Sequence, residues 1–102
     1  MSDVDTIEKV DEEIREVTNE PGRYKVVFIN DNHTPMEWVV DVLTRIFKHT
    51  VESAAEITMQ IHTEGSGIAG VYSFEVAEQK AVETVEQSRK HDFPLQVKLD
   101  EE

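Results

Sequence analysis

The 102-residue sequence contains no cysteine, no long apolar run and comparatively few basic residues. Without cysteine the chain has neither a thiolate nucleophile nor a disulfide framework. No apolar run approaches the ~20 residues that span a bilayer. The start, MSDVDTIEKV, lacks the basic and apolar regions of a secretory signal. We therefore expect a cytosolic protein, with one domain because the chain is too short for two.

The acidic residues outnumber the basic ones by 22 to 10, which gives a formal net charge of −12. Such a surface repels phosphates, so neither nucleic acid nor an anionic membrane is expected as a partner. Residues 1–22 carry eight acids and two bases, a net charge of −6, and end in Pro21-Gly22. We expect a flexible acidic arm at 1–22 and a core domain at 23–102. A solvated tail without a role is the alternative interpretation of the arm.

Three segments have the residue pattern of β-strands. YKVVFIN, from Tyr24, is rich in β-branched and aromatic residues on both faces, which predicts a central strand. Glycines surround a short second strand at Ile68 to Tyr72. In LQVKLD, after Pro94, apolar and polar residues alternate, which is typical of a strand with one wet face.

Three other segments have helical spacing. Thr34-Pro35-Met36-Glu37 predicts a helix start with a threonine cap. Its buried stripe is expected at Met36, Val39, Val40, Leu43, Ile46 and Phe47. Thr50 is expected to cap a second helix that buries Val51, Ala54, Ala55, Thr58, Ile61 and His62 on one face. Ser73 is expected to cap a third, to about Lys90, with Phe74, Ala77, Ala81, Val85 and Ser88 inward.

The resulting order is β-α-α-β-α-β, without an internal repeat. This order predicts a small α+β sandwich in which a three-stranded antiparallel sheet is backed by three helices.

The sequence gives little support to catalysis. The histidines at 33, 49, 62 and 91 are scattered, and no metal-binding spacing or G-x-S-x-G motif is present. We therefore expect no metal site, no cofactor and no catalytic residues.

One polar cluster suggests a binding site. Asn30, Asp31 and Asn32 end the central strand, and His62 lies near the end of the second helix. A carboxylate beside amide and imidazole groups suits an ammonium group next to a peptide unit. The α-amino group of a chain, with a pKa of about 7.7–8.0, is such a cation near neutrality. The alternative is structural, because Asx side chains often cap turns and a histidine suits a helix C-terminus.

Four stretches of the chain follow the sequence pattern of a known family: YKVVFINDNHTPMEWVVDVL, MQIHTEG, GIAGVYSFEVAEQKA and FPLQVKL. They resemble the ClpS family of bacterial adaptors, which deliver substrates to the unfoldase ClpA of the ClpAP protease. The resemblance implies a monomeric, non-catalytic adaptor in the bacterial cytoplasm. It also implies binding of N-degrons, which are chains that begin with Leu, Phe, Tyr or Trp.

The resemblance also implies roles for individual residues. Asn30, Asp31 and His62 correspond to the groups that bind the α-amino group and first peptide unit, with Asn32 beside them. The pocket for the first side chain corresponds to Thr34, Met36, Val39, Thr58, Ile61 and Leu95, with Met36 similar to a gate against β-branched residues. Contacts to the ClpA N-terminal domain correspond to Glu75, Glu78 and Lys80. The acidic arm corresponds to the extension presented to the unfoldase pore.

This sequence departs from the family pattern at two positions. Asn32 stands where a second aspartate is commoner, which lowers the negative charge near a bound ammonium. Thr58 stands where some relatives have methionine, which leaves more room for the first side chain.

Two other functional classes remain open from the sequence. In the first, the protein is a small hydrolase or isomerase that uses Asp31 and His62 as base and acid. In the second, it is a structural interaction domain whose polar cluster only caps a turn and whose acidic arm binds a basic partner.

Overall fold

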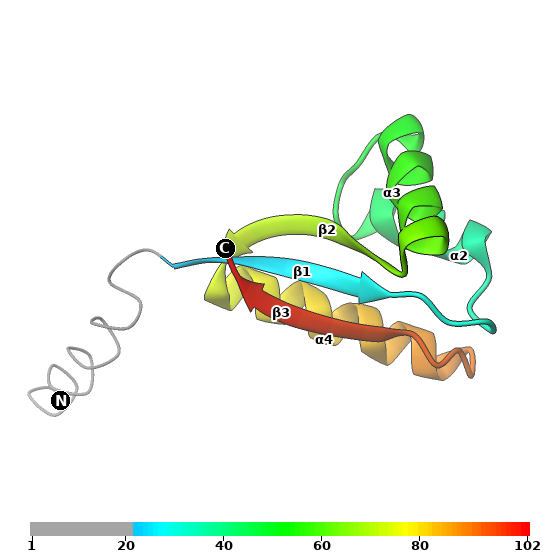
Figure 1. Ribbon diagram of the computed structural model, residues 1–102. Helices are drawn as coiled ribbons and strands as arrows, with labels where there is room; N and C mark the ends of the chain where they lie inside the picture. Colours follow the sequence, from blue (N-terminus) through cyan, green and yellow to red (C-terminus); the bar gives the residue numbers. More distant parts are fainter. Residues whose placement is uncertain (1–21) are drawn as a thin grey trace, which may run out of the picture.

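The order of helices and strands confirms the predicted α+β fold (Figure 1). The computed structural model describes residues 22–102, so the predicted acidic arm lies outside the described residues except for Gly22. The elements are β1 (Arg23–Ile29), α2 (Met36–Arg45), α3 (Val51–Glu64), β2 (Ser66–Ser73), α4 (Phe74–Lys90) and β3 (Gln96–Glu101).

The sheet has the strand order β2-β1-β3, and β1 is antiparallel to both neighbours. β1 is therefore the central strand, as its apolar sequence predicts. β2 is longer than predicted, because Gly67 lies within the strand, opposite Phe28. A Cβ at Gly67 would lie 2.8 Å from the Ile61 side chain, so α3 packs close to the strand there.

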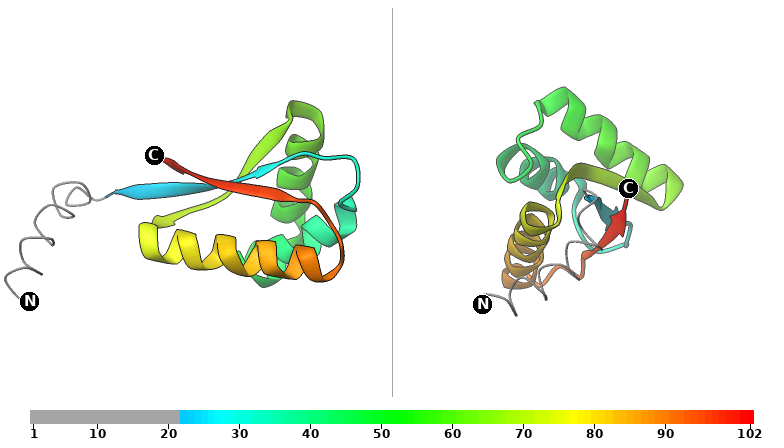
Figure 2. Two further views of the ribbon diagram at one scale, coloured as in Figure 1. Left: turned by 90° about the horizontal axis from the view of Figure 1, so that it is seen from below. Right: turned by 90° about the vertical axis from the view of Figure 1, so that its left-hand side faces the viewer.

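The helices cover different parts of the sheet. α4 runs along one face and packs against all three strands, whereas α3 packs against α2 and β2 (Figures 1 and 2). α2 and α3 lie near the end of the sheet where β1 finishes, in Figure 1 and in the left view of Figure 2. Phe28 of β1 and Phe47, just after α2, meet edge to face in the core with ring centroids 5.5 Å apart. This packing fixes α2 beside the end of β1.

The threonine cap predicted for α2 is wrong. Pro35 occupies the N-cap position, and its side chain makes no cap hydrogen bond. The Thr34 hydroxyl instead donates to the Asp31 carboxylate, at 2.8 Å. Asp31, an Asx side chain three residues upstream, therefore accepts the hydroxyl that was expected to cap the helix.

The face of α3 is narrower than predicted. Thr50 caps the helix as expected, since its side chain accepts from the Ser53 N–H at 3.1 Å. Ala54, Thr58 and Ile61 are buried. The prediction that Val51, Ala55 and His62 share the buried face is wrong, because all three are exposed. Successive side chains of an α-helix point about 100° apart around its axis, so a helix that packs against one layer buries only a stripe of them.

The inward face of α4 also differs in part from its prediction. Ala77 and Ser88 are fully buried, as expected, but Phe74 is 41% exposed. Phe74 lies edge-on to Tyr24, with ring centroids 5.2 Å apart, at the margin of the sheet. Ser73 occupies the N-cap position without making a side-chain hydrogen bond.

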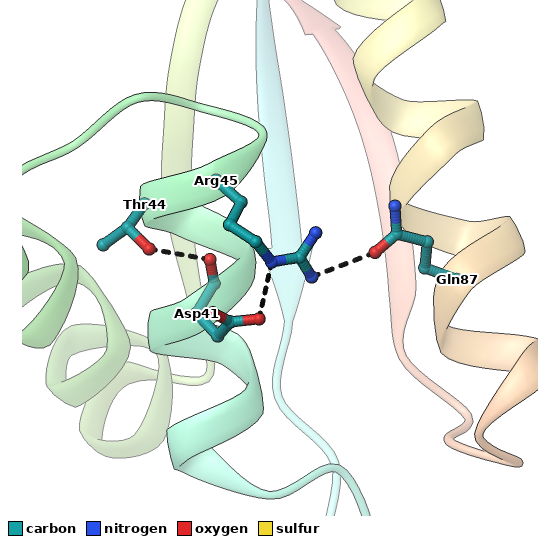
Figure 3. A network of polar contacts seen from close by, with 4 residues as sticks. All are labelled: Asp41, Thr44, Arg45 and Gln87. Atoms are coloured by element: carbon teal, nitrogen blue, oxygen red, sulfur yellow. Dashed lines mark hydrogen bonds and ion pairs between the residues drawn. The ribbon is translucent and has the colours of Figure 1, made fainter.

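Two hydrogen-bonding side chains connect α4 with the C-terminal end of α2. Arg45 donates to Asp41 at 2.7 Å and to Gln87 of α4 at 3.0 Å (Figure 3). The Lys80 ammonium donates to the Ile46 carbonyl at 2.7 Å. The same ammonium lies 5.8 Å and 5.4 Å from the ring centroids of Phe47 and Tyr72. These contacts hold the far end of α2 against α4.

Candidate functional site

A hollow opens where β1 ends, between the loop that follows it, the start of α2 and the second half of α3. Its walls are formed by Ile29, Asn30, Asp31, Thr34, Met36, Val39, Thr58, Ile61, His62 and Leu95. Nine of these ten residues are candidates named from the sequence. Ile29 was missed, although it directly precedes the polar cluster, and Asn32 does not line the hollow.

Asp31 organises the polar wall of the hollow. Its carboxylate accepts the N–H groups of His33 and Thr34, both at 2.7 Å, and the Thr34 hydroxyl at 2.8 Å. This is an Asx turn, so the structural role considered for Asp31 is real. A carboxylate offers about four acceptor sites, so three internal hydrogen bonds leave room for one further donor.

The same hydrogen bonds keep Asp31 ionised. Partial burial alone would raise the pKa of its carboxyl, but the bonds from the Thr34 and His33 N–H groups and the Thr34 hydroxyl outweigh it. The pKa therefore lies below the ordinary value of 3.8. At neutral pH the wall carries a fixed negative charge.

A backbone bond brings the loop and the end of α3 together. The Asn30 N–H donates to the Gly65 carbonyl at 2.9 Å. Gly65 ends α3 with a φ of 94°, in the left-handed region that favours glycine. His62 lies in the last turn of α3 and is exposed. Its imidazole lines the hollow from α3.

The floor of the hollow is apolar and belongs to the core. Val39, Ile61 and Leu95 are buried. Thr58 is buried too, and its hydroxyl donates to the Ala54 carbonyl at 2.8 Å, so it brings no unpaired polar group to the floor. Met36 is the exception, at 41% exposed, and forms the rim.

The hollow is shallow. Its cavity volume is about 20 Å³, room for about one water molecule. The whole space between its walls, open solvent included, is about 290 Å³. The flexible Met36 is the lining side chain that can move aside most easily for something larger.

The arrangement differs from that of an acid–base pair. The three hydrogen bonds of the Asp31 carboxylate go to its own loop, and His62 lies on another wall. Among residues 22–102, no three His, Cys, Asp or Glu side chains gather where they could hold a metal ion. What these walls offer is a carboxylate, an amide and an imidazole above an apolar floor.

The residues matched to an unfoldase contact lie on α4, away from the hollow. Glu75 and Glu78 are exposed on the outer face of the helix, where they line a shallow depression with Gln79, Val82, Glu83 and Glu86. Lys80 is not part of that depression, since its ammonium is turned to the Ile46 carbonyl.

Comparison with known proteins identifies the family. Residues 19–98 match the model of the ATP-dependent Clp protease adaptor protein ClpS. The chain belongs to the ClpS family. It is 43% identical over 88 residues to the ClpS of Maricaulis maris, covering 86% of this chain and 81% of that protein. It is 40% identical over 90 residues to the ClpS of Caulobacter vibrioides strain NA1000, covering 88% and 83%.

A solved ClpS structure has the same fold. The structure of Agrobacterium tumefaciens ClpS2 bound to L-phenylalaninamide has a TM-score of 0.78 and 32% identity. The match covers 81% of this chain and all of that one.

Membership of the ClpS family settles the functional class. ClpS proteins are adaptors of the Clp protease and not themselves enzymes, so this chain is a protease adaptor whose partner is the Clp protease. None of the helices formed by residues 22–102 combines the length and apolar character needed to cross a bilayer.

Proposed function

We propose that the hollow binds the first residue of chains that begin with Leu, Phe, Tyr or Trp, and that the adaptor delivers these N-degrons to the ClpA unfoldase of ClpAP. One observation carries the proposal: an ionised carboxylate and a buried apolar floor line the same hollow. The phenylalaninamide bound by the related Agrobacterium protein combines the two matching groups, an amine and a large apolar side chain.

The polar wall supplies selectivity for a free amine. The α-amino group of a chain is protonated below its pKa of about 7.7–8.0. Asp31 offers the charge and Asn30 the amide oxygen, while His62 faces the first peptide unit from α3. An internal peptide bond has no cation to match the carboxylate, so only a chain end fits.

The apolar floor supplies affinity. Burial of a Leu or Phe side chain is worth about 1.5–3 kcal/mol, and the floor is already built from core residues. Met36 lines the rim of the hollow and is 41% exposed, so its flexible side chain can adjust to a side chain that enters. A flexible rim favours contact with several bulky side chains over one fixed shape.

The outer face of α4 is the proposed contact with the ClpA N-terminal domain. Glu75 and Glu78 present two carboxylates there, next to the exposed Val82. Lys80 stays in the proposal as a neighbour of this face, although its ammonium is already bonded within the fold. Glu75→Gln combined with Glu78→Gln should weaken binding to the isolated ClpA domain and leave peptide binding unchanged.

The proposal is tested by calorimetric titration of three peptides that differ only at the first residue. A peptide with a free N-terminal Phe should bind. The same peptide with an acetylated amine should not, and neither should one that begins with Ala. Equal binding of the three peptides, or binding of none, contradicts the proposal.

A further inference from the structure

α3 carries an exposed apolar side chain next to the hollow that neither the core nor the first-residue pocket uses. Met59 is 51% exposed, and it lies three positions before His62. Residues three apart on a helix are neighbours, with Cβ atoms roughly 5–6 Å apart. The exposed face of α3 continues from Met59 through Ala55 to Val51, which is 67% exposed.

The two walls of the hollow give a bound chain a direction. The carboxylate of Asp31 lies in the loop after β1, and His62 lies on α3. If the amine sits at the carboxylate, the peptide unit that follows is directed toward the His62 wall. The second residue of the chain then lies beyond His62, over the exposed face of α3.

Met59 is the large apolar side chain available at that place on α3. Thr63, the residue after His62, is polar, and its hydroxyl donates to the Met59 carbonyl at 3.0 Å. The hollow's other polar groups, Asn30 and Asp31, belong to the loop after β1. A thioether on three rotatable bonds adapts to apolar partners of different shape.

We propose that Met59 forms a second subsite of the adaptor, which takes an apolar side chain at the second position of the bound chain. The occupant is the substrate itself, because the surface is continuous with the hollow through His62. This inference rests on the proposed function, since it assumes that the hollow holds the first residue. It adds a preference that the first-residue pocket alone does not give.

The test compares three small ligands on the wild-type protein and on Met59→Ala. L-phenylalaninamide has the amine and first side chain but no second residue, Phe-Gly-amide has a second residue without a side chain, and Phe-Leu-amide has both. Phe-Leu-amide should bind the wild type about three- to tenfold more tightly than Phe-Gly-amide, for an apolar contact partly open to solvent. Met59→Ala should remove that gain and leave the affinity for L-phenylalaninamide unchanged.

Two further variants on the same helix sharpen the test. Val51→Ala removes an apolar side chain that is even more exposed than Met59 and lies about 12 Å farther along α3, so it should leave the gain in place. Met59→Glu should reverse the preference, so that Phe-Arg-amide binds more tightly than Phe-Leu-amide.

The outcomes distinguish failure of this inference from failure of the proposed function on which it rests. If none of the ligands binds, both the function and the subsite are wrong. If all three bind the wild type equally, or if Met59→Ala keeps the gain for Phe-Leu-amide, the first-residue site stands and the subsite at Met59 is wrong.

Discussion

The two sides of the hollow are built in different ways. The polar wall is local: Asp31 accepts three hydrogen bonds from the two residues that lie two and three positions later in the chain. The apolar floor comes from three distant segments, with Val39 on α2, Ile61 on α3 and Leu95 before β3. The charge of the wall can therefore change at a small cost in stability, whereas the floor is shared between binding and stability. The following variants separate these two sides.

The largest effect is expected from removing part of the floor. Leu95 is 2% exposed, and Leu95→Ala should lower the free energy of unfolding by about 2–5 kcal/mol through lost burial and a new cavity. Urea unfolding measures the loss. Affinity for a free-Phe peptide should fall at the same time. A variant with unchanged stability would show that the floor is not part of the core.

Filling the floor should give a smaller effect. Thr58→Met adds volume to a buried position beside a hollow of about 20 Å³, and overpacking typically costs about 1–3 kcal/mol. Affinity should fall more for a Trp-initiated peptide than for a Leu-initiated one, as measured by titration. Thr58→Val, of nearly equal volume, is the control. Equal losses for the two peptides would contradict the placement of Thr58 under the first side chain.

A change outside both sides should alter stability alone. Lys80→Met keeps the aliphatic stem but leaves the Ile46 carbonyl without its 2.7 Å partner, at an expected cost of about 1–2 kcal/mol. Lys80→Arg keeps a donor and should recover most of the stability. Peptide affinity should stay at the wild-type value in both variants. A large loss of peptide affinity would mean that the C-terminal end of α2 also determines the shape of the hollow.

The smallest effect is expected from pH, and it concerns the polar wall alone. The pKa of Asp31 is lower in the folded protein than its ordinary value of 3.8, so its ionisation stabilises the fold above that pH. This contribution is lost as pH falls through the lowered pKa. Unfolding in urea between about pH 5 and about pH 3 should show wild type losing more stability than Asp31→Asn. Identical slopes would contradict the Asx turn as the cause of the shift.

Much of the fold follows from residue patterns. The apolar run of β1 predicts a central strand because only a strand covered on both faces buries so many apolar residues, and LQVKLD alternates as a half-exposed strand does. Other details did not follow. Thr34 matches a capping sequence but binds Asp31 instead, since two local hydrogen-bond patterns compete for it. Phe74 was expected to face inward but lies at the surface, where its ring packs against Tyr24. Lys80 was expected on the outer face, but its ammonium turns to the Ile46 carbonyl.

The candidate site was predictable for a different reason. The residue types of Asn30, Asp31 and His62 suggest an ammonium site, but they do not show that a strand end and a helix end meet. The resemblance to the ClpS family predicted that the strand end and the helix end form one site, and it predicted the residues of the apolar floor. The resemblance did not predict that Ile29 lines the hollow, because that depends on how β1 ends. Nor did it predict that Met59, near His62, is exposed.

The central claim is that Asp31 binds the free amine of a substrate in addition to forming a turn. Asp31→Asn isolates that role, because an Asn side-chain oxygen can still accept the His33 and Thr34 N–H groups, and its amide can donate to the Thr34 hydroxyl.

The most direct measurement is the affinity of wild type and Asp31→Asn for a Phe-initiated peptide, free and acetylated, as a thermodynamic cycle. The variant should bind the free peptide about ten- to a hundredfold more weakly, with stability changed by less than about 1 kcal/mol. It should not discriminate against the acetylated peptide. If Asp31→Asn instead binds the free peptide as tightly as wild type does, the carboxylate serves only the turn, and the account is wrong.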